Sequence, residues 1–239
     1  VQSSLIDPVI PMADTTRAAL AGRKYSTALA ELRAIDITKL RGDQIRDRAF
    51  LEAWSGVRAG KTESVTKLVE EVRSADHVPV DYRLLTEAEL LLESGDAVGA
   101  ARVAEMVNPE SGVASRATML RARALEKAGQ TAAARQLWAD LADRSDPSPG
   151  TAAALLALAN KAGIGSAAAY PLLRRLWAAY PATGEGRRAA RILAKEYEPR
   201  GRDFRPRDAE IALYLDGLMG AWRFEEVTTY LGERQSRFV

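Results

Sequence analysis

A repeat marked by glycines sets the strongest limit on how this chain can fold. Gly60, Gly95 and Gly129 stand 35 and then 34 residues apart, and Gly163 follows after a further 34. This step is the period of a tetratricopeptide repeat, in which a short turn joins two antiparallel helices. The sequence therefore predicts a series of helical hairpins with glycine at each turn.

Apolar residues recur at fixed offsets from these glycines. The residues five, eight and twelve positions after each of the first three glycines are Val65, Leu68 and Val72; Ala100, Val103 and Val107; and Ala134, Leu137 and Leu141. Such offsets lie on one face of a helix. Seven positions before the glycines stand Ala53, Ala88 and Ala122, which allow two helices to approach closely. We expect these residues, together with Leu91, to form the core.

The fold class follows from the hairpins. A single hairpin of this size cannot bury its apolar face alone, so stacked copies share one continuous core. We expect an all-α fold, specifically a right-handed superhelix, or solenoid, of about six tetratricopeptide-like hairpins. Residues 1–13 are expected to form an irregular lead-in and 14–239 the helical-repeat domain. Its first turn is expected at Gly22 and its last hairpin at 206–235.

The two ends of the sequence suggest a longer parent protein. The chain begins with Val1 and has no basic segment followed by an apolar core, so we expect that a signal peptide was removed or that the chain is part of a longer protein. At the other end Val239 follows the last predicted helix without a polar capping helix, which also favours a longer protein.

Composition argues against several classes of function. The 34 basic and 32 acidic residues nearly balance, so the chain has no general attraction to nucleic acid. Cysteine is absent and His77 is the single histidine, which argues against thiolate or multi-histidine metal sites. The turn glycines match no phosphate-binding or dinucleotide fingerprint. We expect no cofactor, no metal and no membrane span, since no apolar run approaches about 18 residues.

Several segments of the chain occur in a characteristic order. Asp81-Tyr82 opens a helix after a proline-containing link, Leu176–Pro181 ends a late repeat at Tyr-Pro, and the hairpin segment Ala209–Ala221 follows. The segments read "DYRLLTEAELLLESGDAVGAARVAEMV", "RARALEKAGQTAAARQLWADL", "YPLLRRLWAAYPATGEGRRAARIL" and the closing hairpin "AEIALYLDGLMGA". In this order they resemble the N-terminal superhelical region of bacterial soluble lytic murein transglycosylases, and the resemblance covers roughly residues 45–235.

This resemblance implies a function in the periplasm or cell envelope. In that family a curved helical region accompanies a separate lysozyme-like catalytic domain, which cleaves peptidoglycan without water and leaves a 1,6-anhydro sugar. The catalytic domain uses one glutamic acid. The resemblance thus implies that this chain is the non-catalytic scaffold, with peptidoglycan or a catalytic domain of the same polypeptide as its partner and other envelope proteins as further candidates.

The catalytic part of that family is not expected within this chain. The family pairs a helix-borne Glu-Ser with a downstream Gly-Leu-Met-Gln. Here Glu93-Ser94 ends a repeat helix, and Gly217-Leu218-Met219 continues into Gly220 instead of glutamine. We therefore assign no catalytic residue, although the parent protein is suspected to be a peptidoglycan lytic transglycosylase, a lyase.

Other acidic and aromatic residues have simpler explanations. The acidic pairs Glu70-Glu71, Glu87-Glu89 and Glu225-Glu226 lie among surface-type residues, and we expect them on solvated helix faces. Tryptophan can stack on sugar rings, but the four tryptophans lie on apolar stripes or beside turns. We expect core packing for at least three of Trp54, Trp138, Trp177 and Trp222.

One basic stretch is the candidate ligand site. Between Gly184 and Asp208 eight basic residues exceed five acidic ones, and a basic strip on a helical scaffold suits an anionic polymer such as a glycan with peptide carboxylates. The eight residues are Arg187, Arg188, Arg191, Lys195, Arg200, Arg202, Arg205 and Arg207. The competing explanation is an ordinary charged surface. For the whole chain, the alternative function is a tetratricopeptide-type protein-interaction adaptor in the cell envelope.

Overall fold

The described part of the chain is helical throughout, which confirms the predicted all-α class. The computed structural model describes Ile10 and residues 12–61, 65–75, 78–144, 149–197 and 206–235, and within these it contains thirteen α-helices and no strand. The chain divides into two compact units, Val1–Ala134 and Arg135–Val239, which are described separately. A single domain over 14–239 stays a prediction.

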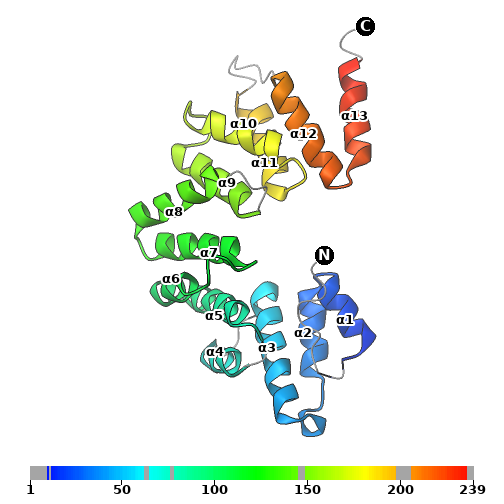
Figure 1. The fold of residues 1–239 in the computed structure, drawn as a ribbon, viewed down its shortest axis with the longest axis vertical. Helices are drawn as coiled ribbons and strands as arrows, with labels where there is room; N and C mark the ends of the chain where they lie inside the picture. The colour runs from blue at the N-terminus through cyan, green and yellow to red at the C-terminus, as the bar shows by residue number, and fades with distance from the viewer. Residues whose placement is uncertain are drawn as a thin grey trace. The chain divides into compact units, whose positions relative to one another are not determined.

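Seven helices lie wholly in the first unit (Figure 1). They are α1 (Asp14–Ala21), α2 (Tyr25–Arg33), α3 (Gly42–Ala59), α4 (Val65–Ser74), α5 (Val80–Ser94), α6 (Ala97–Glu105) and α7 (Ala114–Lys127), with a 3-10 turn at Ile37–Lys39. Each packs against the next along the chain, and α3 and α7 also pack against α5. Helix α8 (Thr131–Asp143) spans the division between the units.

The second unit contains five further α-helices (Figure 1). These are α9 (Pro149–Ala162), α10 (Ala169–Ala179), α11 (Gly184–Ile192), α12 (Asp208–Gly220) and α13 (Phe224–Gln235), and the π-helical turn η2 (Leu193–Tyr197) extends α11. Helix α10 packs against α9, α11 and α12, while α13 packs against α12. The last predicted hairpin, 206–235, therefore corresponds to α12 and α13.

The predicted glycine turns are confirmed by the backbone. Gly60, Gly95, Gly129 and Gly163 have φ values of 66°, 95°, 77° and 84°, each directly after or one residue beyond the end of a helix. A Cβ atom added at any of them would meet nothing within 4 Å. The left-handed backbone conformation, and not lack of space, is therefore what requires glycine there.

The first and last hairpins turn differently from the inner ones. Gly22 lies in the first turn as predicted, but its φ is −79°, and Arg23 with a φ of 56° takes the left-handed conformation. In the last hairpin Trp222 has a φ of 58°. Because a side chain in this conformation is strained, the two outer turns are less well matched to their residues than the four inner turns.

Most of the predicted core positions are buried. Ala53, Ala88 and Ala122 are fully buried, and six of the nine apolar residues that follow the turn glycines are buried: Val72, Ala100, Val103, Val107, Ala134 and Leu141. Leu68 and Leu91 are half-buried and pack against the core cluster of the first unit, and Leu137 is also half-buried. The neighbours of Leu91, Leu90 and Leu92, are buried. A helical pattern predicts which face is buried more reliably than it predicts the burial of a residue at the edge of that face.

One residue of the predicted lead-in belongs to the first unit's core. Ile10 is 2% exposed and clusters with Leu32, Phe50 and Val72, and Met12 packs against the same cluster. The other lead-in residues up to Pro11 lie outside the described part of the chain. The lead-in thus contributes an apolar anchor before α1 begins.

Candidate functional site

The predicted basic strip is partly described and its described members are exposed. Arg187, Arg188 and Arg191 lie on α11, and Lys195 lies on η2 one further turn along the chain. Arg207 is the residue that precedes α12, where its backbone N–H donates to Glu210 Oε2 at 2.8 Å. Arg200, Arg202 and Arg205 lie outside the described residues.

Local packing orients the basic face of α11. Thr183 caps the helix by accepting a hydrogen bond from the Gly186 backbone N–H at 2.9 Å. A Cβ atom on Gly186 would lie 1.9 Å from the carbonyl oxygen of Tyr180, so glycine allows α11 to begin tightly against the end of α10. Ala189 and Leu193 are buried on the inner side. The positions 187, 188, 191 and 195 fall within about a third of the helix circumference, on the opposite side.

The pair Glu87 and Glu89 is buried, so the expectation of a solvated face was wrong for this pair. The two residues are 5% and 8% exposed. Both make ion pairs: Glu87 with Arg73 of α4, and Glu89 with Arg58 of α3 and Arg116 of α7. Sequence analysis missed the burial because the partners of Glu89 lie 31 and 27 residues away, beyond any local pattern.

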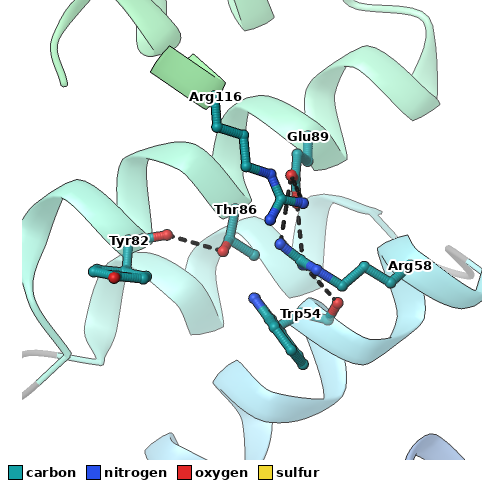
Figure 2. A network of polar contacts seen from close by, with 6 residues as sticks. All are labelled: Trp54, Arg58, Tyr82, Thr86, Glu89 and Arg116. Carbon is teal, nitrogen blue, oxygen red and sulfur yellow. Dashed lines mark hydrogen bonds and ion pairs between the residues drawn. The ribbon is translucent and has the colours of Figure 1, made fainter. Parts of the chain in front are cut away.

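Figure 2 shows Glu89 at the centre of a polar cluster that joins three helices. Arg58 Nη1 lies 3.1 Å from Glu89 Oε2, and Arg116 Nη2 donates to Glu89 Oε1 at 2.6 Å. Arg58 Nη1 also donates to the carbonyl oxygen of Trp54 at 2.9 Å, and its guanidinium carbon lies 4.1 Å from the centre of the Trp54 ring. We call this set of four residues the arginine-glutamate cluster.

Burial has an electrostatic consequence in the arginine-glutamate cluster. Burial lowers the pKa of Arg58 to about 10, and the nearby Glu89 acts in the opposite direction. Only 8% of the Arg58 side chain and 10% of the Glu89 side chain are exposed. A carboxylate held on both sides by guanidinium groups from two other helices is suited to joining those helices.

The two segments that imitate the transglycosylase active site do not form one in the described residues. Glu93 and Ser94 are exposed at the end of α5, where Ser94 Oγ donates to the carbonyl oxygen of Leu91 at 2.8 Å. Gly217 lies on α12, where an added Cβ atom would come within 2.8 Å of Pro181. The glutamate ends a helix and the glycine allows close packing, so both have structural explanations.

The tryptophans follow the expectation for three of the four positions. Trp138 and Trp177 are buried, and Trp54 is partly buried against the first unit's core. Trp222 is 81% exposed and meets Phe224 edge to face, with ring centroids 5.8 Å apart. The exposed tryptophan therefore belongs to the turn of the last hairpin.

An aromatic and acidic hollow lies on this last hairpin, and sequence analysis missed it. The hollow has a volume of about 320 Å³ and is lined by Tyr214 of α12 and by Glu225, Glu226, Thr229, Tyr230 and Glu233 of α13. The lining residues of α13 lie on one helix face, a spacing that was present in the sequence. Glu225 is exposed, as expected for a solvated helix face, and Glu226 is partly exposed.

A second hollow, of about 300 Å³, lies in the first unit at the start of α2. It is lined by Arg23, Lys24, Tyr25, Ser26, Thr27, Arg58 and Ala59. Its basic residues could attract an anion, but Arg58 already pairs with Glu89. The single histidine, His77, lies outside the described residues.

Comparison with known proteins yields no family for this chain. No protein-family model, curated protein or solved structure matches it. Among the residues that the structure describes, no group of three or more histidine, aspartate or glutamate side chains is arranged to hold a metal ion. Across the same residues, no helix combines the length and apolar character needed to cross a membrane.

Proposed function

We propose that this chain is the non-catalytic scaffold of a protein similar to the lytic murein transglycosylases, and that it positions a separate catalytic domain on peptidoglycan. Its hairpins form a right-handed superhelix in the periplasm, and the parent protein cleaves the glycan without water. Support comes from the regular glycine turns and from the order of the segments that resemble that family. The scaffold binds peptidoglycan and the attached domain performs the chemistry.

The observation that carries this proposal is the exposed basic face of α11 and η2. Three arginines and one lysine project from one side of a helix whose other side is buried in the second unit. Peptidoglycan carries carboxylates on its stem peptides, and a row of guanidinium groups is suited to several carboxylates at once. Because the arginines are surface groups, binding should weaken as salt is added.

The non-catalytic part of the proposal is supported by the ion pairs that three glutamates make with arginines of the chain. Glu87 and Glu89 are occupied by ion pairs with arginines, and Glu210 is held by Arg174, whose Nε donates to Glu210 Oε1 at 3.0 Å. The hydrogen bond from Arg174 and those around it hold the pKa of Glu210 below its usual value, against the opposing effect of burial. Such a carboxyl group is a weak general acid at neutral pH.

A binding assay with insoluble peptidoglycan sacculi tests the proposal. The purified chain is mixed with sacculi, the bound fraction is measured after centrifugation, and soluble glycan is assayed in the supernatant. We expect binding that decreases with salt and no release of 1,6-anhydro sugars. Failure to bind at low salt would contradict the proposal, and glycan release would contradict its non-catalytic part.

A pair of double variants locates the binding to α11. Arg188→Gln with Arg191→Gln removes two charges from the basic face, while Arg102→Gln with Arg123→Gln removes two exposed charges from α6 and α7. We expect the first variant to bind sacculi about fivefold or more weakly and the second to bind like the wild type. Equal losses in both would indicate general charge attraction instead of a site.

A protein-interaction adaptor of the cell envelope is the second candidate function. It is favoured by exposed apolar residues on the last hairpin: Leu213, Met219, Trp222, Phe224 and Leu231. Five of the eleven large apolar residues that are exposed in the described part of the chain lie on this one hairpin. A chain that fails to bind sacculi but is recovered with a defined envelope protein would support this function over the scaffold.

A further inference from the structure

The hollow on the last hairpin is built on a stack of aromatic rings. The Tyr214 ring stacks on Trp177 of α10, with centroids 4.7 Å apart and an angle of 18° between the planes. Tyr230 of α13 in turn packs against Tyr214, with ring centroids 4.9 Å apart and an angle of 42° between the ring planes. Trp177 is buried while both tyrosines are half-buried. The stack therefore leads from the core of the second unit to its surface.

Carboxylates surround the outer end of this stack. Glu225, Glu226 and Glu233 line the same hollow as the two tyrosines. Arg223 pairs with Glu226 at its edge. Burial raises the pKa of the Tyr214 hydroxyl, and Tyr230 and Glu233 act in the same direction. The hollow thus combines electron-rich ring faces with negative charge, which is the environment that attracts a cation.

The chain itself fills such environments with arginine at two other places. Arg58 lies over the Trp54 ring and pairs with Glu89. Arg174 lies 5.5 Å from the centre of the Tyr170 ring and pairs with Glu210. In both cases one guanidinium group joins an aromatic ring to a carboxylate, because it can stack and form directed hydrogen bonds at the same time.

We propose that the hollow between α12 and α13 binds an arginine side chain from a basic segment of a partner protein. The guanidinium group stacks against Tyr230, the outer ring of the stack, and pairs with Glu225, as Arg58 does with Trp54 and Glu89. Peptidoglycan is a poor occupant here because its stem-peptide carboxylates would face the glutamates of the hollow. This site is separate from the basic face of α11 and does not depend on peptidoglycan binding.

Fluorescence anisotropy with a labelled hexa-arginine peptide tests this proposal on the whole chain. A hexa-citrulline peptide is the matched probe, since citrulline has the shape of arginine without its charge. We expect saturable binding of hexa-arginine that weakens with salt, and at least tenfold weaker binding of hexa-citrulline, which lacks the charge and has an acceptor oxygen in place of one donor group. Equal affinities for the two peptides would overturn the proposal.

Three variants assign the binding to the hollow. Glu225→Gln removes one carboxylate and Tyr230→Leu removes one ring, and each is expected to weaken hexa-arginine binding about two- to fivefold. Tyr230→Phe keeps the ring and should bind like the wild type, which separates the contribution of the ring from that of the hydroxyl. Glu110→Gln, at an exposed carboxylate of the first unit, is the control and should change nothing.

Two further results would overturn the proposal. One is a wild-type affinity in both Glu225→Gln and Tyr230→Leu, which would place the bound peptide elsewhere. The other is concentration-dependent self-association of the wild type that Glu225→Gln abolishes, as measured by sedimentation, because the occupant would then be a second copy of the chain.

Discussion

The arginine-glutamate cluster of the first unit and the hollow on the last hairpin contain the same kinds of group in different states. In the first unit the aromatic ring of Trp54 and the carboxylate of Glu89 share an arginine of the chain itself. On the last hairpin Tyr214 and Tyr230 meet glutamates around an open hollow. The first arrangement joins three helices, and the second leaves space for a group from outside.

The difference shows how one chemical pattern can serve either stability or binding. A buried ion pair between helices fixes their spacing, and its loss leaves a charge without compensation. The same groups at a surface cost little to the fold and stay available to a ligand. Substitutions in the first unit should therefore change stability, and substitutions on the last hairpin should change binding.

The largest effect is expected at Leu90, the fully buried leucine beside Glu89. Leu90→Ala should lower the free energy of unfolding by about 4 kcal/mol, because it removes apolar contacts and leaves a cavity in the core of the first unit. Leu213→Ala is the matched change on the last hairpin, where the side chain is 53% exposed, and it should cost about 0.5 kcal/mol or less. Urea unfolding measures both losses of free energy. Equal losses would contradict the expectation that substitutions in the first unit change stability more than those on the last hairpin.

Breaking the arginine-glutamate cluster should have the next largest effect. Glu89→Gln leaves Arg58 buried with a neutral partner, and we expect a loss of about 3 kcal/mol, at the lower end for buried pairs because Arg116 is 46% exposed. Glu225→Gln is the control and should leave the unfolding midpoint unchanged while weakening hexa-arginine binding. A Glu89→Gln protein as stable as the wild type would mean that the cluster does not hold the helices together.

The sequence predicted the helices and inner turns well because both depend on local patterns. The spacing of Gly60, Gly95 and Gly129 and the alanines before them follow from the repeat, and a repeat is visible in one sequence. The burial of Glu89 was not predictable, since it depends on arginines from two other helices. The half-burial of Leu91 was missed because it lies at the edge of a helical stripe. The solenoid arrangement and the family resemblance stay predictions.

The hollow was missed for a related reason. Tyr214 and Tyr230 are 16 residues apart on different helices, and their ring contact arises only when α12 and α13 fold back on each other. Within α13 the acidic residues look like an ordinary solvated face. A glutamate's function in this chain depends on what the neighbouring helix brings to it, and periodicity within one helix carries no such information.

The inner and outer turns offer a smaller test of how well residues match the backbone. Gly95→Ala should lower the free energy of unfolding by about 1–2 kcal/mol, because alanine is strained at a φ of 95°. Trp222→Gly should instead be neutral or raise stability by up to about 1 kcal/mol, since glycine relieves the left-handed strain and the lost side chain is exposed. Thermal unfolding measures the stability of both variants. An equal loss of stability in the two would contradict the expected difference between inner and outer turns.

The smallest expected effect concerns Glu52 of α3, whose pKa is raised more by burial than it is lowered by Arg48. Burial raises the pKa of Glu52, while Arg48 acts to lower it. Because the carboxyl holds its proton more tightly in the folded chain than in the unfolded chain, its ionisation disfavours folding. This destabilising contribution is absent below the ordinary pKa of 4.5 and grows as pH rises through the window between 4.5 and the raised pKa.

Glu52→Gln should remove this decrease of stability with pH and raise the free energy of unfolding at pH 7 by about 0.5 kcal/mol or less. Arg48→Gln should make the free energy of unfolding decrease more strongly as pH rises. Urea midpoints measured from pH 4 to pH 8 give both slopes, and a Glu52→Gln curve parallel to the wild type would show that Arg48 offsets the effect of burial on this carboxyl.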